Sequence, residues 1–310
     1  MPAKTSSSQN YNEKESIKIC RFCKSFNIIR KGLRKTENRG SIQRYFCKSC
    51  KKKFVIDDGF FRMRNNPEKI TNSLHLYFSG ASLRKTQAHL AVFYPHNASY
   101  VSILKWIRKY SNLVTEFTDK LNLKVGEELM SDEMEYATKG QQTWFVDVLD
   151  TKTRYIVSSD FMRSRTLERL IHVLRNAKKR TGNQVKIITT DGLRGYPAVL
   201  RKSFGLHKIK GKTKIQHNIV IASERGFNHK IERFHNSVRE RTKIFRGFHG
   251  SIESARSMMK GYIIYYNFCR KHQGINYYPY QLATDLVLGK NKWLDLIKLS
   301  NISKTLSDTI

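Results

Sequence analysis

The 310-residue sequence has no long apolar run, and its N-terminus carries no apolar segment. A membrane-spanning helix needs roughly 20 consecutive apolar residues, and no stretch approaches that length. A secretory signal needs an apolar segment near the start, whereas residues 1–16 are polar and small. These absences argue against an integral membrane protein and against a secreted one. We expect an intracellular protein located in the cytoplasm.

Acidic residues are scarce in this chain. There are 25 Asp and Glu against 58 Lys and Arg, so the formal net charge is +33. A compact chain with so much charge of one sign repels itself unless a polyanion offsets it. Because Lys and Arg are spread over the whole sequence, they can neutralise a long track of phosphates. We expect a nucleic-acid partner; a generally solvated basic surface and binding to a membrane surface are the alternatives, and no basic amphipathic helix dominates to favour a membrane.

The residues that are present divide the chain into segments. Residues 1–16 resemble a disordered tail, but 39% hydrophobic residues are enough for packed cores elsewhere. Residues 17–58 hold short β-like pieces around cysteines, and residues 67–122 are typical of helices. Residues 127–250 alternate between strands and helices, and residues 251–310 add C-terminal helices. The expected fold is therefore α/β: a mixed sheet with flanking helices, preceded by a small cysteine ribbon and an all-helical domain.

Four of the five cysteines form two C-x-x-C pairs, Cys20 with Cys23 and Cys47 with Cys50. Each pair can place two thiolates on one tetrahedral ion, and two pairs complete a four-sulfur shell. The spacing predicts one structural Zn²⁺. Disulfides are the competing interpretation, which a reducing cytosol disfavours. A redox pair is the third, but no thioredoxin-like pattern accompanies the motif.

Two further features lie near cysteines. Lys51, Lys52 and Lys53 follow the last cysteine of the predicted ribbon. We expect them to contact phosphates. Cys269 stands alone in an aromatic helical run, 262–268, and is interpreted as a small buried apolar residue rather than a ligand.

Residues 67–110 have the pattern of three short helices. Pro67 suits the first turn of a helix that Gly80 ends. Ser82 caps a second helix over 83–91, and Asn97 or Ser99 caps a third that ends near Tyr110. This succession predicts a helix-turn-helix domain.

The third of these helices has a basic outer face. Its apolar residues recur at helical spacing, so four other side chains face outward: Tyr100, Lys105, Arg108 and Lys109. Outward polar residues on such a helix are typical of contacts with bases and phosphates. The alternative is an ordinary helical linker with a solvated basic face.

Two acids follow from the predicted strands. Asp132 lies in the first of three successive strands, and a helix over about 166–180 leads to a fourth strand, 185–190. Asp191-Gly192 follows that fourth strand directly. Ligands of open α/β sheets bind at such strand ends. Taken alone, an Asp-Gly pair after a strand is usually a turn.

A third acid, Glu232, lies on a helix that begins near residue 227. The apolar stripe of this helix includes Ile231, Phe234 and Val238, and Glu232 lies on the neighbouring stripe. A helix packed by its apolar stripe holds such a residue at the edge of the core. The plainer interpretation is a solvated acid paired with a nearby arginine, and for a single Glu it would prevail.

Three clustered acids in a basic protein favour phosphodiester chemistry. Such cleavage uses two divalent ions about 3.5–4 Å apart, one at the attacking oxygen and one at the leaving oxygen. Carboxylates are the hard ligands that Mg²⁺ prefers. The metal ions also cancel the repulsion between the carboxylates.

The order Asp132, Asp191, Glu232 resembles the ribonuclease-H-like catalytic core of DDE transposases and retroviral-type integrases. Arg239, seven residues after Glu232, matches the basic residue that these enzymes carry two turns on. The segments 132–133, 191–192, 228–235 and 241–248, with a helix-turn-helix at 82–110, resemble the bacterial and archaeal insertion-sequence-six family. The resemblance covers residues 67–260, and only some relatives carry an N-terminal cysteine ribbon.

This resemblance implies a DNA transposase that is nucleoid-associated and works as a dimer or larger assembly. It would bind double-stranded DNA at terminal inverted repeats, free 3′ hydroxyls by water attack, and join them to a target phosphate. Two Mg²⁺ or Mn²⁺ ions per active site would be held by Asp132, Asp191 and Glu232, and Arg239 would contact DNA near the site.

Two departures leave alternatives open. The spacing from Asp191 to Glu232 is longer than in the family, with a basic insertion at 208–214, and Glu224 is a rival third acid outside the Asn-x-x-x-Glu context. A catalytically inactive DNA-binding remnant and a nuclease without strand transfer are the competing functions. The presence of all three acids favours the transposase over the remnant, and the helix-turn-helix argues against the plain nuclease.

Overall fold

The fold is given by a computed structural model, which describes residues 19–37, 39–94, 98–205, 214–220, 229–243, 248 and 250–307. The chain forms two compact units, one from residues 1–69 with 287–310 and the other from residues 70–286. These units group the C-terminal residues with the N-terminal ones, and the finer domain boundaries expected above stay predictions. Across the described ranges, no helix combines the length and the apolar character needed to cross a membrane.

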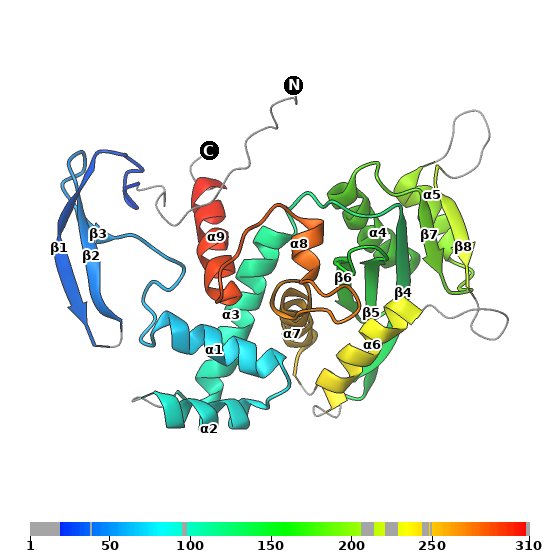
Figure 1. The fold of residues 1–310 in the computed structure, drawn as a ribbon, viewed down its shortest axis with the longest axis horizontal. Coiled ribbons are helices and arrows are strands. Elements are labelled where there is room, and N and C mark those ends of the chain that lie inside the picture. The colour runs from blue at the N-terminus through cyan, green and yellow to red at the C-terminus, as the bar shows by residue number, and fades with distance from the viewer. Residues whose placement is uncertain are drawn as a thin grey trace. The chain divides into compact units, whose positions relative to one another are not determined.

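The first unit contains a three-stranded antiparallel sheet in the order β1-β2-β3 and the helix α9 (Figure 1). Their bounds are β1 Ile28–Thr36, β2 Gly40–Cys47, β3 Lys53–Val55 and α9 Lys292–Ser307. Tyr45 and Phe54 pack with two buried cysteines into a small core. Gly59 has φ +89°, and an added Cβ would lie 2.6 Å from Ile297 of α9, so only glycine fits there.

Three helices begin the second unit, the first of them from its fourth residue onward: α1 Pro67–Phe78, α2 Leu83–Phe93 and α3 Tyr100–Thr118. The hydroxyl of Ser82 caps α2 and that of Ser99 caps α3, each accepting a backbone N–H at 3.2 Å. Asn97, the other candidate cap, lies outside the described residues. The prediction that the third helix ends near Tyr110 was wrong, because its apolar stripe continues through Val114 and keeps the helix buried to Thr118.

The centre of the second unit is a five-stranded mixed sheet in the order β6-β5-β4-β7-β8. Its strands are β4 Glu128–Thr138, β5 Gln141–Asp150, β6 Ile156–Met162, β7 Ile187–Thr190 and β8 Gln216–Ile219. β4, β5 and β6 pair antiparallel, while β7 and β8 run parallel to β4. The expected mixed sheet with a helical crossover is therefore confirmed.

Helices flank this sheet, as Figure 1 shows. They are α4 Leu167–Thr181, α5 Tyr196–Phe204, α6 His229–Thr242, α7 Ile252–Ile264, the π-helix η2 Tyr265–Cys269 and α8 Pro279–Ala283. Among these, α6 and α7 are separate helices. A Cβ on Gly261 of α7 would lie 2.2 Å from both Phe78 of α1 and Ser111 of α3. This close approach shows that α7 packs tightly on these two helices.

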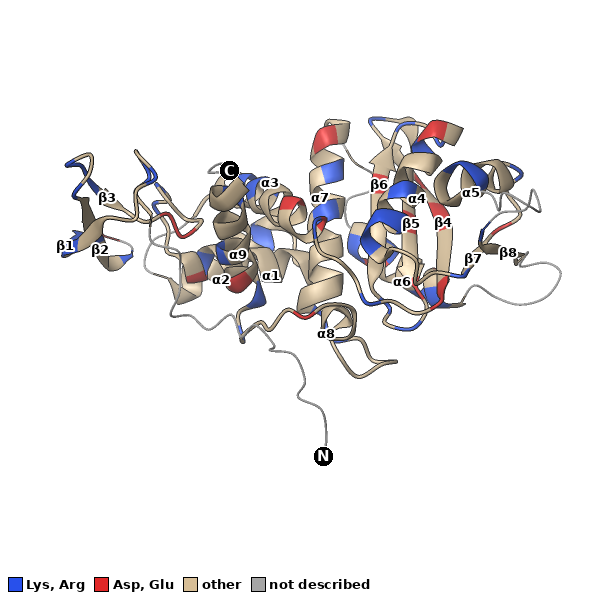
Figure 2. Cartoon of the chain, turned by 90° about the horizontal axis from the view of Figure 1, so that it is seen from above, with Lys and Arg blue, Asp and Glu red and all other residues tan. Residues whose placement is uncertain are grey.

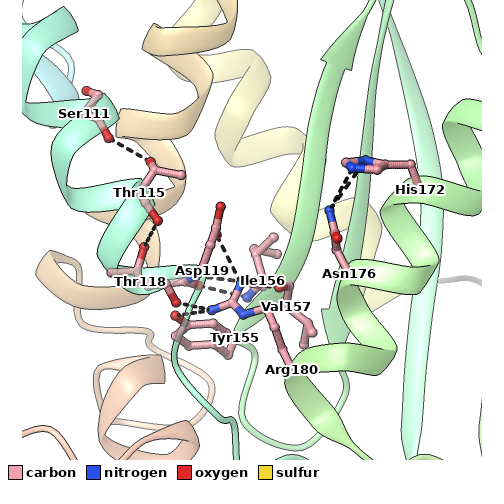
Figure 3. A network of polar contacts seen from close by, with 11 residues as sticks. Ser111, Thr115, Thr118, Asp119, Tyr155, Ile156, Val157, His172, Asn176 and Arg180 are labelled. Carbon is pink, nitrogen blue, oxygen red and sulfur yellow. Dashed lines mark hydrogen bonds and ion pairs between the residues drawn. The ribbon is translucent and has the colours of Figure 1, made fainter. Parts of the chain in front are cut away.

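A buried arginine ties the first helices to the sheet (Figure 3). Arg180, in the last turn of α4, donates to the carbonyl of Thr118 at 2.8 Å and to the carbonyl of Val157 in β6. It also approaches the carboxylate of Asp119 at 3.5 Å and the hydroxyl of Tyr155 at 3.3 Å. One guanidinium therefore connects α3, α4 and β6.

Candidate active site

Three carboxylates meet where β7 ends. Asp132 and Glu133 are consecutive on β4, and Asp191 follows β7 directly; their oxygen atoms lie within 4.8 Å of one another. Consecutive strand residues point to opposite faces. However, β7 pairs with β4 only as far as Ser131 and Thr190. Between that pair and the bridge from Thr138 to Phe248, no described strand pairs with this edge of β4, so acids from both faces can reach Asp191.

Hydrogen bonds fix each of the three acids. The hydroxyl of Tyr196, at the start of α5, donates to Glu133 at 2.8 Å. Asp191 accepts the backbone N–H of Leu193 at 3.1 Å, and Asp132 accepts that of Glu133 at 2.8 Å. Tyr196 is fully buried. The cluster is therefore held by the fold rather than by flexible surface side chains.

Burial and nearby carboxylates make Asp132 and Glu133 hard to ionise. Burial raises the pKa of Asp132 to about 6, with smaller contributions from Asp147 and Asp191. Burial also raises the pKa of Glu133 to about 7, and Asp191 and Asp132 add to the effect. A divalent cation would offset this cost, because carboxylates are its preferred ligands and its charge cancels their repulsion. The donor set therefore fits Mg²⁺ or Mn²⁺.

A buried pair of side chains, Asp147 and His235, lies next to Asp132. Asp147 lies opposite Asp132 in the pairing of β4 with β5 and is fully buried. The imidazole of His235, on α6, lies with Nε2 2.8 Å from Asp147 and with Nδ1 3.5 Å from Asp132. Burial alone would lower the pKa of His235, but Asp147 and Asp132 raise it above its ordinary value. Since Ser131 contacts α5 and Asp132 contacts α6, the two helices cover opposite faces of the sheet.

The predicted acids are only partly brought together. Asp132 and Asp191 share the cluster, but Glu232, half-buried on α6, is not in that group. Glu232 instead lines a cavity with Arg154 and His272. Arg239 is exposed on α6, and Glu224 lies outside the described residues.

Sequence reasoning missed two site residues. Glu133 follows Asp132 directly, and this adjacent acid was the available signal. Asp147 interrupts an apolar strand, 143–149, and a carboxylate in such a strand must find a partner. Neither position revealed which element would supply its contacts.

The four paired cysteines form a second cluster, in the first unit. Their sulfurs lie within 4.8 Å of one another, and all four are free thiols. Sγ of Cys20 is 3.6 Å from that of Cys50, and Sγ of Cys23 is 3.5 Å from that of Cys47. Tetrahedral zinc with Zn–S distances of about 2.3 Å separates its sulfurs by about 3.8 Å. The arrangement therefore fits Zn²⁺.

The predicted DNA-contacting residues lie mostly on the surface. Lys105, Arg108 and Lys109 are exposed on α3, and Tyr100 is 40% exposed at its start. Arg108 also donates to the hydroxyl of Ser254 on α7 at 2.6 Å. In the first unit three consecutive lysines are exposed, namely Lys51, Lys52 and Lys53.

Comparison with known proteins gives one family match. Residues 213–279, which include α6 and Glu232, match the sequence profile of a family described as "Integrase core domain". The match covers less than half of the chain. The five-stranded mixed sheet fits a ribonuclease-H-like integrase core. A search of curated protein sequences gave no match.

Solved structures with some likeness include two viral ones. The catalytic core domain of HTLV-2 integrase in complex with magnesium, in its trimeric form, is 13% identical; the likeness covers 51% of this chain and 97% of that chain, with a TM-score of 0.37. A chain of the simian T-cell lymphotropic virus intasome in complex with PP2A regulatory subunit B56 gamma is 14% identical. The likeness covers 68% of this chain and 71% of that chain, with a TM-score of 0.38.

Proposed function

We propose that this chain is a DDE-type DNA strand transferase that cleaves and joins phosphodiester bonds with divalent cations. The observation that carries the proposal is the group of Asp132, Glu133 and Asp191 where β7 ends. The integrase-core match over residues 213–279 supports it, because that segment contains the helix that contacts Asp132. A net charge of +33 suits a DNA partner.

Asp132 and Asp191 are the proposed ligands for two Mg²⁺ or Mn²⁺ ions. Bound there, the ions would activate the attacking oxygen and stabilise the leaving oxygen. The chain's own residues orient the ligands: His235 holds the side of Asp132 that faces α6, and Tyr196 holds Glu133.

The third acid is Glu232 in our proposal, with Glu133 as its rival. Glu232 lies about one helical turn before His235, and His235 already reaches the cluster. A change of the side-chain rotamer of Glu232 is the smallest movement that could bring its carboxylate closer to the other two acids. Glu133 needs no movement. Comparing Glu232→Gln with Glu133→Gln decides between them, because loss of the ligand abolishes cleavage.

The finer proposal is an insertion-sequence transposase that binds terminal inverted repeats as a dimer or larger assembly. The capped helices α2 and α3 support it, since α3 presents exposed Lys105 and Lys109. Arg239, exposed on α6, is proposed to contact DNA near the site. We propose one structural Zn²⁺ at the four cysteines.

One observation favours a second candidate function. Because Glu232 lies outside the acidic group, a catalytically inactive DNA-binding protein derived from a transposase is the alternative. Such a protein would bind DNA and leave it uncut.

The test is a Mg²⁺-dependent cleavage and joining assay on the DNA ends that flank the protein's own gene. Wild-type protein should give joined products, and Asp191→Asn should give none while it binds the same DNA. Glu135→Gln, an exposed acid on the same strand as Asp132, is the matched control and should remain active. Binding without cleavage by wild type, over a range of metals and ends, would establish the inactive alternative.

A further inference from the structure

A basic cavity of about 570 Å³ lies along α6 in the second unit. Its size falls within the range of about 300–1,000 Å³ that small-molecule sites occupy, so it has room for more than a single anion. The lining comes from α6, from the turn between β5 and β6, and from the loop after η2. The lining residues are Arg154, His229, Lys230, Glu232, Arg233, Asn236, His272 and Gly274.

The charge of this lining is strongly positive. Three cationic side chains, Arg154, Lys230 and Arg233, face one acid, Glu232, and two histidines complete the wall. Figure 2 shows basic residues along α6. Burial lowers the pKa of Arg154; Tyr266 and Asp150 oppose this effect, and Arg233 adds a smaller lowering through cation repulsion. An anion in the cavity would relieve this repulsion.

Arg154 is the most informative residue of the lining. Its Nη1 is buried, and within the described part of the chain it has no hydrogen-bond partner. A buried guanidinium nitrogen without an acceptor is costly. Its backbone has φ +62°, a conformation that non-glycine residues rarely adopt, and a hydrogen bond of 2.9 Å from its N–H to the carbonyl of Asp150 holds it there. This conformation belongs to the turn between β5 and β6, and it fixes where Arg154 leaves the backbone.

His272 adds a neutral donor. Burial lowers its pKa, and Arg154, Arg270 and Arg233 lower it further. Its Nδ1 accepts the backbone N–H of Gly274 at 3.1 Å. The neutral ring therefore carries its proton on Nε2, which can donate to an anionic oxygen.

We propose that this cavity binds the phosphodiester backbone of a DNA strand through Arg154, Arg233 and His272. The proposal rests on the proposed function, since it takes DNA as the substrate. None of the lining residues named above is Phe, Tyr or Trp, so the site lacks a platform for base stacking. Its cationic lining suits phosphates, which carry no sequence information directly. Glu232 lines the same cavity, so the bound strand would pass the proposed third acid.

The test is the affinity of the full-length protein for fluorescein-labelled DNA, measured by anisotropy without added divalent cations over a range of salt concentrations. Arg154→Ala and Arg233→Ala should each weaken binding about tenfold. Each should reduce the slope of log affinity against log salt by about one, and do so equally for unrelated DNA sequences. Lys179→Ala, an exposed cation on α4 outside this lining, is the matched control and should change affinity by less than about twofold.

Two further measurements distinguish a DNA-backbone site from a folding defect and from a site for free phosphate. Arg154→Lys keeps the charge but loses the planar fork, so it should weaken binding while melting within a few degrees of wild type. Inorganic phosphate, titrated calorimetrically, probes the other source of this chemistry. Wild-type salt slopes in both alanine variants would overturn the proposal, as would variants that lose phosphate binding but keep their DNA affinity.

The outcome is also distinguishable from failure of the proposed function. Normal DNA binding by the cavity variants, together with loss of cleavage in Asp191→Asn, would remove the cavity proposal alone. Weakened DNA binding by the cavity variants, with Asp191→Asn still cleaving, would remove the DDE assignment and leave the cavity as a DNA site.

Discussion

Asp147 is a fully buried carboxylate in the middle of an apolar strand, and His235 is the partner that makes this burial tolerable. Its Oδ1 accepts from the imidazole, while Oδ2 has no hydrogen-bond partner among the described residues. A buried ion pair is weak evidence for stability, because an apolar pair often serves as well. Because the pair also contacts Asp132, we infer that it positions this proposed ligand.

Substituting His235 alone should therefore lower the free energy of unfolding more than substituting both His235 and Asp147. His235→Leu leaves Asp147 buried without compensation, and we expect a loss of about 3–5 kcal/mol in the free energy of unfolding. Asp147→Leu with His235→Leu should recover most of that loss while Mn²⁺ binding at Asp132 stays impaired. Urea unfolding monitored by fluorescence measures the cycle. Additive effects of the two substitutions would contradict the pairing.

The raised pKa values in the cluster predict how stability depends on pH without metal. The folded state holds the pKa of Asp132 at about 6 and that of Glu133 at about 7, above the ordinary values of 3.8 and 4.5. Their contribution to stability is full below about pH 4, and it is lost as pH rises through about 6 to 7. In buffer without added divalent cations, the melting temperature should fall between pH 5 and pH 8, and Mg²⁺ should restore part of it at pH 8.

Glu133→Gln separates this effect from other titrating groups. The introduced amide does not ionise, so the melting temperature of this variant should fall less over the same pH range than that of wild type. Glu135→Gln, exposed on the same strand, should follow the wild-type curve. Parallel curves for wild type and Glu133→Gln would show that the cluster does not titrate as described.

At the scale of elements, the sequence predicts whether a segment forms a helix or a strand better than it predicts where neighbouring elements stop pairing. The strand carrying Asp132 and the one before Asp191 follow from their apolar patterns, and both acids reach the site. Glu133 joins them because β7 stops pairing at Thr190, a tertiary detail that no local pattern contains. Likewise, the period of α6 places Glu232 beside the apolar stripe, but which acid faces the cluster depends on how the helix packs on the sheet.

Arg180 gives an element-scale prediction, since it alone connects α4 with the end of α3 and with β6 in the network described above. Arg180→Met keeps much of the side-chain volume but leaves the carbonyls of Thr118 and Val157 without this donor. We expect a loss of about 2–4 kcal/mol in unfolding free energy. Lys179→Ala on the exposed face of α4 should change it by less than about 0.5 kcal/mol. Equal stability of both variants in urea titrations would contradict the role of this contact.

At the scale of the whole molecule, two metal sites of different character are proposed in two compact units. The cysteine cluster has four thiols in a closed shell, which suits structural zinc. Metal analysis of fresh, reduced protein should find about one zinc per chain. Cys47→Ser should lower the zinc content and unfold the three-stranded sheet, whereas Cys269→Ser should keep the zinc. Protein that is folded and free of zinc would remove this proposal.

The central claim is that Asp132 and Asp191 form a divalent-cation site for phosphodiester chemistry. Counting bound Mn²⁺ by electron paramagnetic resonance, with DNA present, tests it without requiring the correct terminal sequence. We predict saturable binding of about two ions per chain in wild type, greatly weakened in Asp132→Asn and in Asp191→Asn and unchanged in Glu135→Gln. Equal Mn²⁺ binding by wild type and both site variants would contradict the account.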